Sequence, residues 1–597
     1  MPTIIVKKKD LDALVGRKMS PGQLESYLPW VKGEFKEFNE KTDELKIELN
    51  DSNRPDLWCT EGIARQIKLK LKGTLPEYPF YRQVPKRTPL QIVVEKGVQN
   101  IRPYIAAFGV ANFAMTEEAL VQFIQTQEKL ADVFGQKRKL LSIGIYHLDR
   151  VEFPLIYKAV SPGQARFVPL GFEQEMTLQE ILEKHPKGKA YRNVFKSEEK
   201  VPLFVDQKGT ILSFPPIINS REAGEVKPGK KNLFVEVTGA DLRLVNLVLN
   251  ILATNLFDRG ATILPVMVTF PYQTVFGKKI TFPLEIPAPM DLSAKEVERM
   301  LGENVKGETI KKALISYGHA VKTVGKKIKV TPPPFRNDLI HSVDLIEDVA
   351  ISLGYDSFVP EMPKDFTRGA LSKEETFSDT LREYFIGFGF QEIISNILSS
   401  REELVNKMNL TEAPLVEIDN VMTAQYAVVR NQILPSLLRV EAASGKAFYP
   451  HQIFEIGEVA EKDPSQNLGS TTRIQLTALV AHPTASFSEM HSYLETLFYY
   501  LFGPEHLIYK LTPSDHATFI SGRAGKIEVP KKTLPGNGEL NRGGGVERTQ
   551  EISDKRVEMT PAGLIGEIDP EVLDRWQIGV PCVSLTLDVT ALLTLLS

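Results

Sequence analysis

Four carboxylates lie in one short segment of the chain, at Asp338, Asp344, Glu347 and Asp348. The last three are spaced i, i+3 and i+4, so a helix would carry them on one face. Like charges at this spacing repel each other by about 0.2–0.5 kcal/mol per pair, and a positive group should therefore compensate them. A cluster made only of oxygen ligands suits a hard cation such as Mg2+. The alternative is an acidic first helical turn that is solvated and favoured by the helix dipole.

The sequence around the carboxylates predicts a loop followed by a short helix. Ser342 is a good N-cap, and Gly354 is a natural stop. The apolar residues between them recur at helical spacing, at Val343, Ile346, Val349, Ala350 and Leu353. We therefore expect this apolar stripe to face the core, with Asp344, Glu347 and Asp348 on the other face.

The composition is that of a globular chain. Its 597 residues are 42% hydrophobic and 25% charged, which leaves room for about four domains. The 72 basic residues are balanced by 75 acidic ones, and the formal net charge is -3. Such a chain is not a nucleic-acid binder by bulk charge, so any RNA contact must come from a local basic face or from a partner subunit.

Three features predict a cytoplasmic protein that does not enter a membrane. Cys59 and Cys582 are too far apart in sequence to suggest a motif, and they indicate a reducing compartment. The first ten residues lack the apolar core of a signal peptide. The most apolar stretch, residues 242–257, is interrupted by three asparagines, which indicates a buried helix rather than a membrane span.

The N-terminal part, residues 1–85, predicts a small α/β unit. Residues 44–49 alternate between apolar and polar side chains as a half-buried strand does, and Thr60 opens a helix. Between these elements, Arg54 and Asp56 stand in a turn. They could form an ion pair within the turn that contributes little to stability, or they could contact a partner chain or RNA.

The central part predicts a strand, a hairpin and a further strand. These elements cover residues 141–146, then 201–205 and 210–214 joined by the turn 206–209, and finally 232–239. Alternation places Glu236 and Thr238 on the same face of the last strand. The cationic run at residues 137–139 is either a solvated surface or a contact with phosphates.

The carboxylate segment resembles the magnesium-binding segment of the phenylalanyl-tRNA synthetase beta subunits. The similar residues are Arg-Asn-Asp-Leu at 336–339, Asp-Leu-Ile-Glu-Asp-Val-Ala at 344–350 and Gly-Tyr at 354–355. Three further stretches, residues 53–58, 213–220 and 454–457, resemble the archaeal and eukaryotic form of this family. They occur in the family's order and span nearly the whole chain. The resemblance implies that Asp338, Asp344, Glu347 and Asp348 bind Mg2+.

The resemblance also implies an α+β multidomain fold. Its parts are a mixed α/β editing domain, a small metal-bearing domain with a basic helix, and a class II synthetase-like antiparallel sheet with helices. The expected domains are residues 1–85, 86–275, 276–360 and 361–597. The last lacks the Arg-x-Glu and Gly-x-Gly-x-Gly-x-x-Arg motifs of a working class II site, which predicts a catalytically silent copy. Its polar insertion, residues 531–559, is rich in glycine and charge and predicts a mobile loop.

In this family the editing domain removes tyrosine wrongly attached to phenylalanine tRNA, and the matching pocket positions are Phe204, Ser213, Glu236 and Thr238. A phenylalanine site rejects an analogue with an added hydroxyl by only about a hundredfold, so proofreading is needed. A pocket whose buried polar groups bind that hydroxyl discriminates by a further factor on the order of ten thousand, and Glu236 is the expected acceptor. Alternatively, Ser213 and Thr238 are ordinary strand residues. The sequence shows no catalytic triad, so hydrolysis would use an oriented water and the tRNA itself.

The resemblance implies an assembly of two alpha and two beta subunits. Alpha would bind ATP and phenylalanine and charge phenylalanine tRNA, because no residue for aminoacylation is expected on beta, which would edit and scaffold. Two other classes stay open: a stand-alone tRNA-proofreading hydrolase, and a non-catalytic scaffold that binds tRNA or protein. The first would not need residues 361–597, and the second would be free to lose the four carboxylates, so the sequence favours a ligase subunit.

Overall fold

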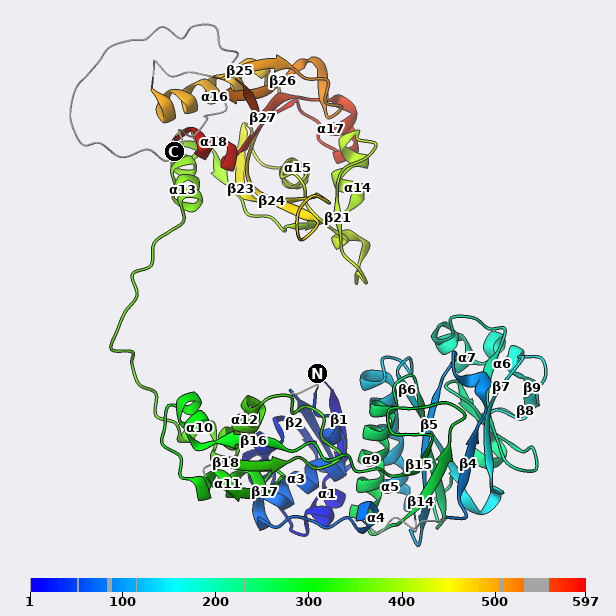
Figure 1. Ribbon diagram of the computed structural model, residues 1–597. Helices are drawn as coiled ribbons and strands as arrows, with labels where there is room; N and C mark the ends of the chain where they lie inside the picture. Colours follow the sequence, from blue (N-terminus) through cyan, green and yellow to red (C-terminus); the bar gives the residue numbers. More distant parts are fainter. Residues whose placement is uncertain are drawn as a thin grey trace. The chain divides into compact units, whose positions relative to one another are not determined.

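The computed structural model describes residues 2–50, 53–82, 88–113, 115–229, 231–325, 327–503, 509–530 and 558–596. Two compact units divide the chain between Met362 and Pro363 (Figure 1). Several sheets with helices build both units, so the predicted mixed α/β multidomain architecture is confirmed. The insertion predicted at residues 531–559 lies, up to residue 557, outside the described residues.

A three-stranded antiparallel sheet opens the N-terminal unit. Its strand order is β1 (Thr3–Lys7), β3 (Glu44–Leu49) and β2 (Gly33–Asn39). Two helices that pack against each other accompany it, α1 (Lys8–Val15) and α3 (Thr60–Lys72). The predicted strand at residues 44–49 and the helix that begins at Thr60 are confirmed.

A ten-stranded sheet forms the largest part of the N-terminal unit. Along its path lie β12 (Ile218–Asn219), β11 (Ile211–Phe214), β10 (Val201–Val205), β7 (Leu155–Val160), β4 (Gln91–Val94), β14 (Thr262–Thr269), β5 (Tyr104–Ala111), β13 (Leu233–Gly239) and β6 (Leu141–His147), with β15 (Lys279–Phe282) paired to β14. The predicted hairpin is β10 and β11, and the predicted strands on either side of it are β6 and β13. All four are confirmed.

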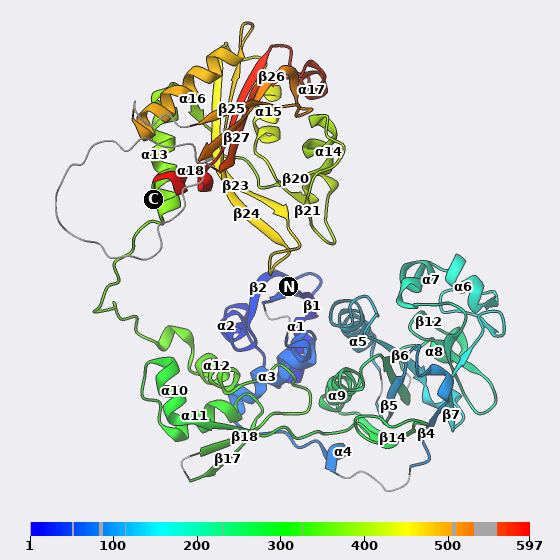
Figure 2. The same ribbon diagram turned by 45° about the horizontal axis from the view of Figure 1, so that its top comes forward.

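Two long helices, α5 (Glu117–Lys129) and α9 (Leu242–Asp258), lie along the same side of this sheet in Figures 1 and 2. α9 packs against β5 and β13, and its apolar residues are buried in the core. The buried helix predicted from residues 242–257 is therefore confirmed. Among the described residues, no helix is long and apolar enough to span a membrane.

The two ends of the ten-stranded path approach each other. Tyr146 on β6 places its hydroxyl 2.8 Å from Oγ of Ser213 on β11. Asn219 on β12 donates from Nδ2 to the carbonyl oxygen of Ile145 on β6, at 3.4 Å. The short helix α8 (Arg221–Gly224) packs against both β6 and β11. The sheet thus curls, and strands that are distant along its path form opposite walls of one cavity.

A second three-stranded sheet follows, with order β16 (Met290–Ser293), β18 (Lys327–Thr331) and β17 (Ala320–Val324). It packs with α10 (Ala294–Leu301), α11 (Gly307–Ile315) and α12 (Ser342–Leu353). α12 is the helix predicted after the loop, and it ends at Gly354, as expected.

Three details of the α12 prediction are wrong. The N-cap is His341, and Ser342 is already the first helical residue. Val343 is 41% exposed, although the apolar pattern placed it in the core. Asp348 is only 1% exposed, although the pattern placed it on the face opposite the core. The helix is turned so that Asp348 reaches the buried side chains of Arg336 and His319, and Val343 is turned outward as a consequence.

The C-terminal unit contains a seven-stranded sheet. Its order is β19 (Gln391–Glu392), β23 (His451–Lys462), β24 (Ser470–Ala481), β28 (Cys582–Asp588), β27 (Met559–Ile568), β26 (Phe519–Pro530) and β25 (Lys510–Pro513), and only the β19–β23 pair is parallel. One face packs on α13 (Lys373–Gly387), α16 (Phe487–Phe502) and α18 (Val589–Leu596), and the other on α15 (Leu434–Ala443) and α17 (Pro570–Trp576), as Figure 2 shows. The expected antiparallel sheet with helices is therefore present.

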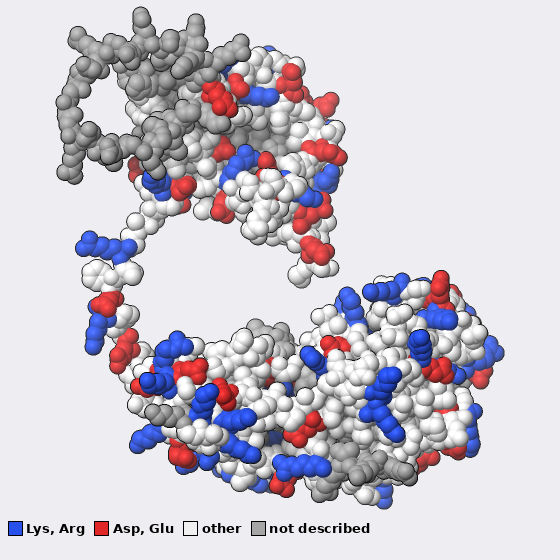
Figure 3. Space-filling view, in the orientation of Figure 1, with Lys and Arg blue, Asp and Glu red and all other residues white. Residues whose placement is uncertain are grey.

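Charge is mixed over the surface. Figure 3 shows Lys and Arg side chains spread among Asp and Glu over the visible face of the N-terminal unit. This agrees with the formal net charge of -3. On that face, contact with a polyanion would depend on individual cations at particular places.

Candidate active site

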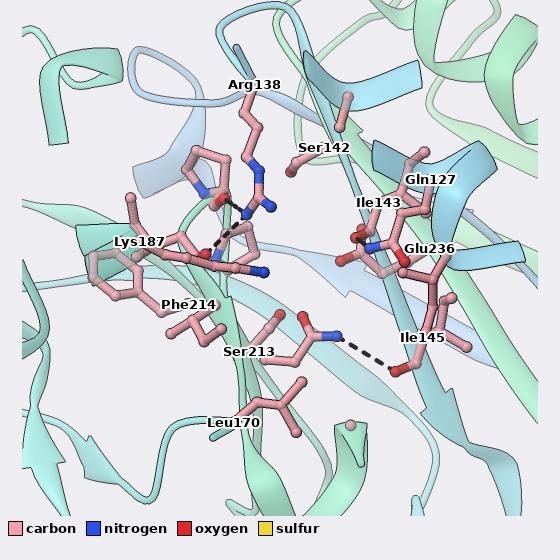
Figure 4. Close-up of a pocket in the computed structure, with 18 of the residues that line it drawn as sticks. Gln127, Arg138, Ser142, Ile143, Ile145, Leu170, Lys187, Ser213, Phe214 and Glu236 are labelled. Carbon is pink, nitrogen blue, oxygen red and sulfur yellow. Dashed lines mark hydrogen bonds between the residues drawn. The ribbon is translucent and has the colours of Figure 1, made fainter. Parts of the chain in front are cut away.

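The Glu236 pocket is a cavity of about 210 Å³ between the two ends of the ten-stranded sheet. Its polar lining comes from Gln127, Glu128, Arg138, Ser142, Lys187, Ser213, Asn219, Glu225 and Glu236, most of them labelled in Figure 4. Apolar side chains of α5, β6 and the segment after β11 complete the wall. Pockets for drug-sized ligands measure roughly 300–1,000 Å³, so this one suits a group about as small as a single amino-acid side chain.

The carboxyl group of Glu236 is the central polar group of the pocket. The residue is 2% exposed, and the hydroxyl of Tyr146 lies 3.0 Å from its Oε1 and 2.8 Å from Oγ of Ser213. Its second oxygen, Oε2, is buried and has no hydrogen-bond partner among the described residues. Burial raises the pKa of Glu236 to about 8, although the Tyr146 hydrogen bond and the charge of Arg102 act to lower it. A neutral carboxyl group can donate and accept, which matches a hydroxyl ligand.

Gly144 makes room for this carboxyl group. It stands opposite Glu236 in the pairing of β6 with β13, so both residues face the same side of the sheet. A Cβ at this position would collide with Oε1 of Glu236 and with the hydroxyl of Tyr146. Any larger residue would therefore displace the Tyr146–Glu236 contact.

Arg102 lies buried beneath the pocket and organises two hydroxyls. Its Nε donates to Oγ1 of Thr238 at 3.0 Å, and its NH2 donates to Oγ of Ser142 at 3.2 Å. The two hydroxyls lie 2.9 Å apart. Burial lowers the pKa of Arg102 to about 10, so the guanidinium stays charged at neutral pH. Within the described ranges it forms no ion pair, and all of its hydrogen-bond acceptors are neutral oxygens.

The structure separates the four residues expected to form the pocket. Ser213 and Glu236 line it. Thr238 lies below the lining, held by Arg102. Phe204 is fully buried behind the wall, where its ring packs with those of Tyr146, Tyr157 and Phe234 at centroid distances of 6.2–6.3 Å. Phe204 and Thr238 therefore shape the pocket from behind, and neither forms its surface.

Sequence reasoning missed Ser142, Gly144, Tyr146 and Arg102. The first three alternate along β6, so they share the face that pairs with Glu236 and Thr238. A polar or small residue at every second position of an otherwise apolar strand was the available signal. Arg102 gave no such signal, because it lies before β5 and reaches the site only through the fold.

Two cations stand on the wall opposite Glu236 in Figure 4. Arg138 donates from NH1 to the carbonyl oxygens of Pro216 and Ile217, at 3.1 and 2.9 Å, and its guanidinium lies 4.2 Å from the ring centre of Tyr191. Lys187 directs its amino group toward the cavity. Of the cationic run at residues 137–139, Arg138 is thus a wall residue, while its two lysine neighbours are exposed.

The turn residues Arg54 and Asp56 form a buried ion pair. Nε and NH2 of Arg54 each lie 2.8 Å from an oxygen of Asp56, and both side chains are about 3% exposed. Arg54 also lies 3.9 Å from Asp338. The ion pair expected within the turn is therefore present, although it is buried, and neither side chain is exposed for contact with RNA.

Each of the four carboxylates of the expected metal site has a partner in the protein, and two of them share one. Arg336 lies between Asp338 and Asp348, with Nε 3.0 Å from Oδ1 of Asp338 and NH1 2.6 Å from Oδ2 of Asp348. Asp348 also contacts Nε2 of His319 at 2.7 Å. Burial alone would raise the pKa of Asp348, but the charge of Arg336 outweighs it and holds that pKa below its usual value.

The other two carboxylates face away from this cluster. Oδ2 of Asp344 accepts the backbone N–H groups of Ile340 and His341 at 2.6 and 2.7 Å, which satisfies donors at the start of α12. Glu347 pairs with Lys32 at 2.9 Å. Among the described residues, no group of three or more potential ligands is placed to hold a metal ion. The arrangement does not fit a four-carboxylate Mg2+ site, and the positive compensation that the spacing required comes from Arg336 and Lys32.

Family models match the second half of the chain. Residues 359–589 match the phenylalanyl tRNA synthetase beta chain CLM domain, and residues 290–355 match the tRNA synthetase B5 domain. The CLM match covers the seven-stranded sheet, and the B5 match covers the second three-stranded sheet with α10, α11 and α12.

Relatives extend the similarity along the whole chain. The phenylalanine–tRNA ligase beta subunit of Borrelia recurrentis (strain A1) is 38% identical over 596 residues, which is 99% of this chain and 100% of the relative. That of Borreliella burgdorferi (strain ZS7) is 38% identical over 547 residues, which is 91% of this chain and 95% of the relative. A crystal structure of an N-terminal fragment of the phenylalanyl-tRNA synthetase beta subunit from Pyrococcus horikoshii aligns with a TM-score of 0.55 at 37% identity, over 59% of this chain and all of the fragment. The chain belongs to the family of phenylalanine–tRNA ligase beta subunits and is thus a subunit of an aminoacyl-tRNA ligase.

Proposed function

We propose that the Glu236 pocket is an editing site that hydrolyses tyrosine from mischarged phenylalanine tRNA. One observation carries the proposal: Glu236 lines a cavity of about 210 Å³, and its Oε2 is buried and has no partner among the described residues. An unpaired buried polar oxygen is costly, by about 1–3 kcal/mol, and a ligand hydroxyl would remove that cost.

This arrangement distinguishes tyrosine from phenylalanine. The phenolic hydroxyl would bind Oε2, while the ring would fill the small cavity. Phenylalanine would fill the same space but leave Oε2 unpaired, so phenylalanine would bind more weakly than tyrosine. Hydrolysis would use a water molecule held over the ester, since the described lining of the pocket contains no Cys or His nucleophile or base.

The experiment uses the complex of alpha and beta subunits with tyrosyl-tRNA and phenylalanyl-tRNA made on phenylalanine tRNA. The wild-type complex should release tyrosine well above the buffer rate and spare phenylalanine. Glu236→Ala should slow tyrosine release by about tenfold or more, since a buried hydrogen bond is lost. Glu222→Ala, an exposed glutamate on α8, is the matched control. Tyrosine release at the buffer rate in a wild-type complex that still charges phenylalanine would refute the proposal.

The main activity requires partners. A beta subunit implies an alpha subunit and tRNA, and we place ATP and phenylalanine on alpha in an assembly of two of each chain. The C-terminal unit supports this, because it exposes large apolar side chains such as Ile394, Met422 and Phe448. Buried Arg430 is bound to Glu455 at 2.7 Å, which fits a catalytically silent class II sheet. The mass of the purified complex, measured by light scattering, tests the stoichiometry.

The domain assignment is also part of the proposal. We assign residues 86–275 to editing, 276–360 to the B5-type domain and 361–597 to the class II-like domain, after an N-terminal domain at 1–85. The division between Met362 and Pro363 and the two family matches support the later boundaries. The archaeal and eukaryotic form stays a proposal, because the Pyrococcus fragment is 37% identical to this chain and the bacterial Borrelia recurrentis relative is 38% identical. The free, buried cysteines Cys59 and Cys582 support a cytoplasmic location.

Magnesium stays a prediction. Binding by Asp338, Asp344, Glu347 and Asp348 together would require Arg336 to release two of them. Equilibrium dialysis of the complex against Mg2+, with wild-type beta and with Glu347→Gln, tests whether this segment holds the ion. Equal binding by both proteins would assign any bound Mg2+ to another site.

A further inference from the structure

We infer that Ser142 is a catalytic residue of the editing reaction, where its hydroxyl donates a hydrogen bond to the ester carbonyl oxygen of the substrate. This inference rests on the proposed function of the Glu236 pocket. The hydroxyl of Ser142 belongs to the pocket lining and points into the cavity in Figure 4. Neither the family matches nor the expected pocket residues include a role for it.

The position of Ser142 suits the ester end of the substrate. In the pairing of β6 with β13, Ser142 stands opposite Thr238 and Gly144 stands opposite Glu236. Ser142 is therefore displaced from Glu236 by two residues along the strand, roughly 7 Å, on the same face of the sheet. This is about the distance that a tyrosine side chain spans between its hydroxyl and its backbone. A tyrosine bound at Glu236 would hold its ester near Ser142.

The hydrogen-bond network determines where the Ser142 proton points. Each hydroxyl has one proton to donate. Thr238 is fully buried, accepts from Arg102 and has one further hydroxyl neighbour, Ser142, among the described residues. Its proton must therefore go to Ser142, or remain unpaired in the core at a free-energy cost.

Ser142 then accepts twice and keeps its own proton. It accepts from Thr238 and from NH2 of Arg102, and within the described part of the chain no acceptor for its proton is found. The remaining open direction is the cavity. The network thus presents one O–H donor to a ligand in the pocket.

Arg102 makes this donor stronger. Its buried charge is not neutralised by an ion pair in the described ranges, and it acts directly on the oxygens of Ser142 and Thr238. A cation that donates to a hydroxyl oxygen polarises the O–H bond, and a fixed donor stabilises negative charge that develops on an acceptor. Arg102 is thus a positioning residue that acts through Ser142.

The chemical step is ester hydrolysis. The oxygen of a water molecule bonds to the carbonyl carbon, and the carbonyl oxygen becomes an oxyanion that accepts the Ser142 hydrogen bond. The bond between that carbon and the ribose oxygen of the tRNA then breaks. One proton of the water goes to the ribose oxygen, and the other leaves the new carboxylic acid for solvent. Ser142 forms no covalent bond and keeps its proton throughout.

The test is single-turnover and steady-state deacylation of tyrosyl-tRNA by the alpha and beta complex. Ser142→Ala should lower kcat by about 10²–10³-fold, the effect typical of one oxyanion donor, with KM nearly unchanged. Ser142→Thr keeps the hydroxyl and should restore kcat to within about tenfold of wild type. Ser197→Ala, an exposed serine before β10, is the matched control and should have wild-type kinetics.

The outcomes separate this inference from the proposed function. Suppose that the wild-type complex releases tyrosine and that Ser142→Ala has the same kcat, with or without a raised KM. The inference about Ser142 is then wrong, and the editing function stands. If wild type releases no tyrosine, both are wrong. Charging of phenylalanine by each variant complex verifies folding. If Ser142→Ala does not fold, Ser142→Thr is compared with Arg102→Lys instead. A lower kcat in Arg102→Lys alone supports the inference, and a wild-type kcat in Arg102→Lys overturns it.

Discussion

The hydroxyl of Tyr146 lies 3.0 Å from Oε1 of Glu236, while Oε2 of the same carboxyl group has no partner among the described residues. One oxygen is therefore held by the protein, and the other is left unpaired within the described part of the chain. Because Tyr146 also contacts Ser213 across the closed sheet, this single hydroxyl links the two walls of the pocket.

Tyr146→Phe should weaken both the fold and the discrimination. The change removes the partner of Oε1 and of Ser213, so we expect a loss of about 1–3 kcal/mol in the free energy of unfolding. We also expect the ratio of tyrosine to phenylalanine release to fall, because an unrestrained carboxyl group positions Oε2 poorly. Tyr104→Phe is the control, since its hydroxyl makes no hydrogen bond within the described ranges. An unchanged ratio in Tyr146→Phe would contradict the role of this hydroxyl.

Gly144→Ala should close the pocket. Its Cβ would collide with Glu236 and Tyr146, and overpacking of this kind costs about 1–3 kcal/mol. We expect tyrosine release to be lost while charging of phenylalanine by the complex persists. Gly163→Ala is the control, because no atom lies within 4 Å of a Cβ at that position. Normal editing by Gly144→Ala would show that substrate does not enter this cavity.

Glu236→Gln should remove a pH dependence of stability. The folded-state pKa of Glu236 is raised from 4.5 to about 8, so the folded chain binds more protons than the unfolded chain between those values. The contribution of Glu236 to the stability of the N-terminal unit is therefore largest below pH 4.5, and it is lost as the pH rises from 4.5 through 8. At about 1.36 kcal/mol per pKa unit, the loss is at most about 5 kcal/mol.

The measurement is denaturant unfolding of wild type and Glu236→Gln at several pH values across that window. The difference in unfolding free energy between the two proteins should change with pH, in favour of the variant at alkaline pH. A constant difference would mean that Glu236 titrates normally in the folded chain.

Arg336→Ala should strongly destabilise the region around α12. The substitution leaves Asp338 and Asp348 without their shared cation, and breaking a buried ion pair from one side costs about 3–5 kcal/mol. Thermal unfolding of the complex should show an earlier transition for this variant. Arg299→Ala, on the exposed face of α10, should leave the transition in place. If Arg336→Ala were as stable as wild type, the ion pairs of Arg336 with Asp338 and Asp348 would be exposed to solvent rather than buried.

Local patterns predicted the elements well, because strands such as β3 and β13 and the helix α9 follow from alternation and apolar content within a few residues. Contacts between distant segments were beyond that reasoning. Asp348 was placed on the face opposite the core because neither Arg336 nor His319 adjoins it in the helical pattern. Arg102 and Tyr146 were missed for the same reason, since their partners on β11 and β13 follow them by many residues. Family resemblance supplied Glu236 and Ser213, and the geometry supplied what holds them.

The closure of the ten-stranded sheet also sets the order in which the pocket can arise. Tyr146 on β6 leaves the ribosome well before Ser213 and Glu236. The two walls of the pocket can meet only after both of these residues have been synthesised. Non-local strand pairing is slow because the intervening chain must first be ordered. A nascent chain that stops before β13 therefore lacks Glu236, the partner of Tyr146 on that strand. Both walls of the cavity can therefore come together only after β13 has been synthesised.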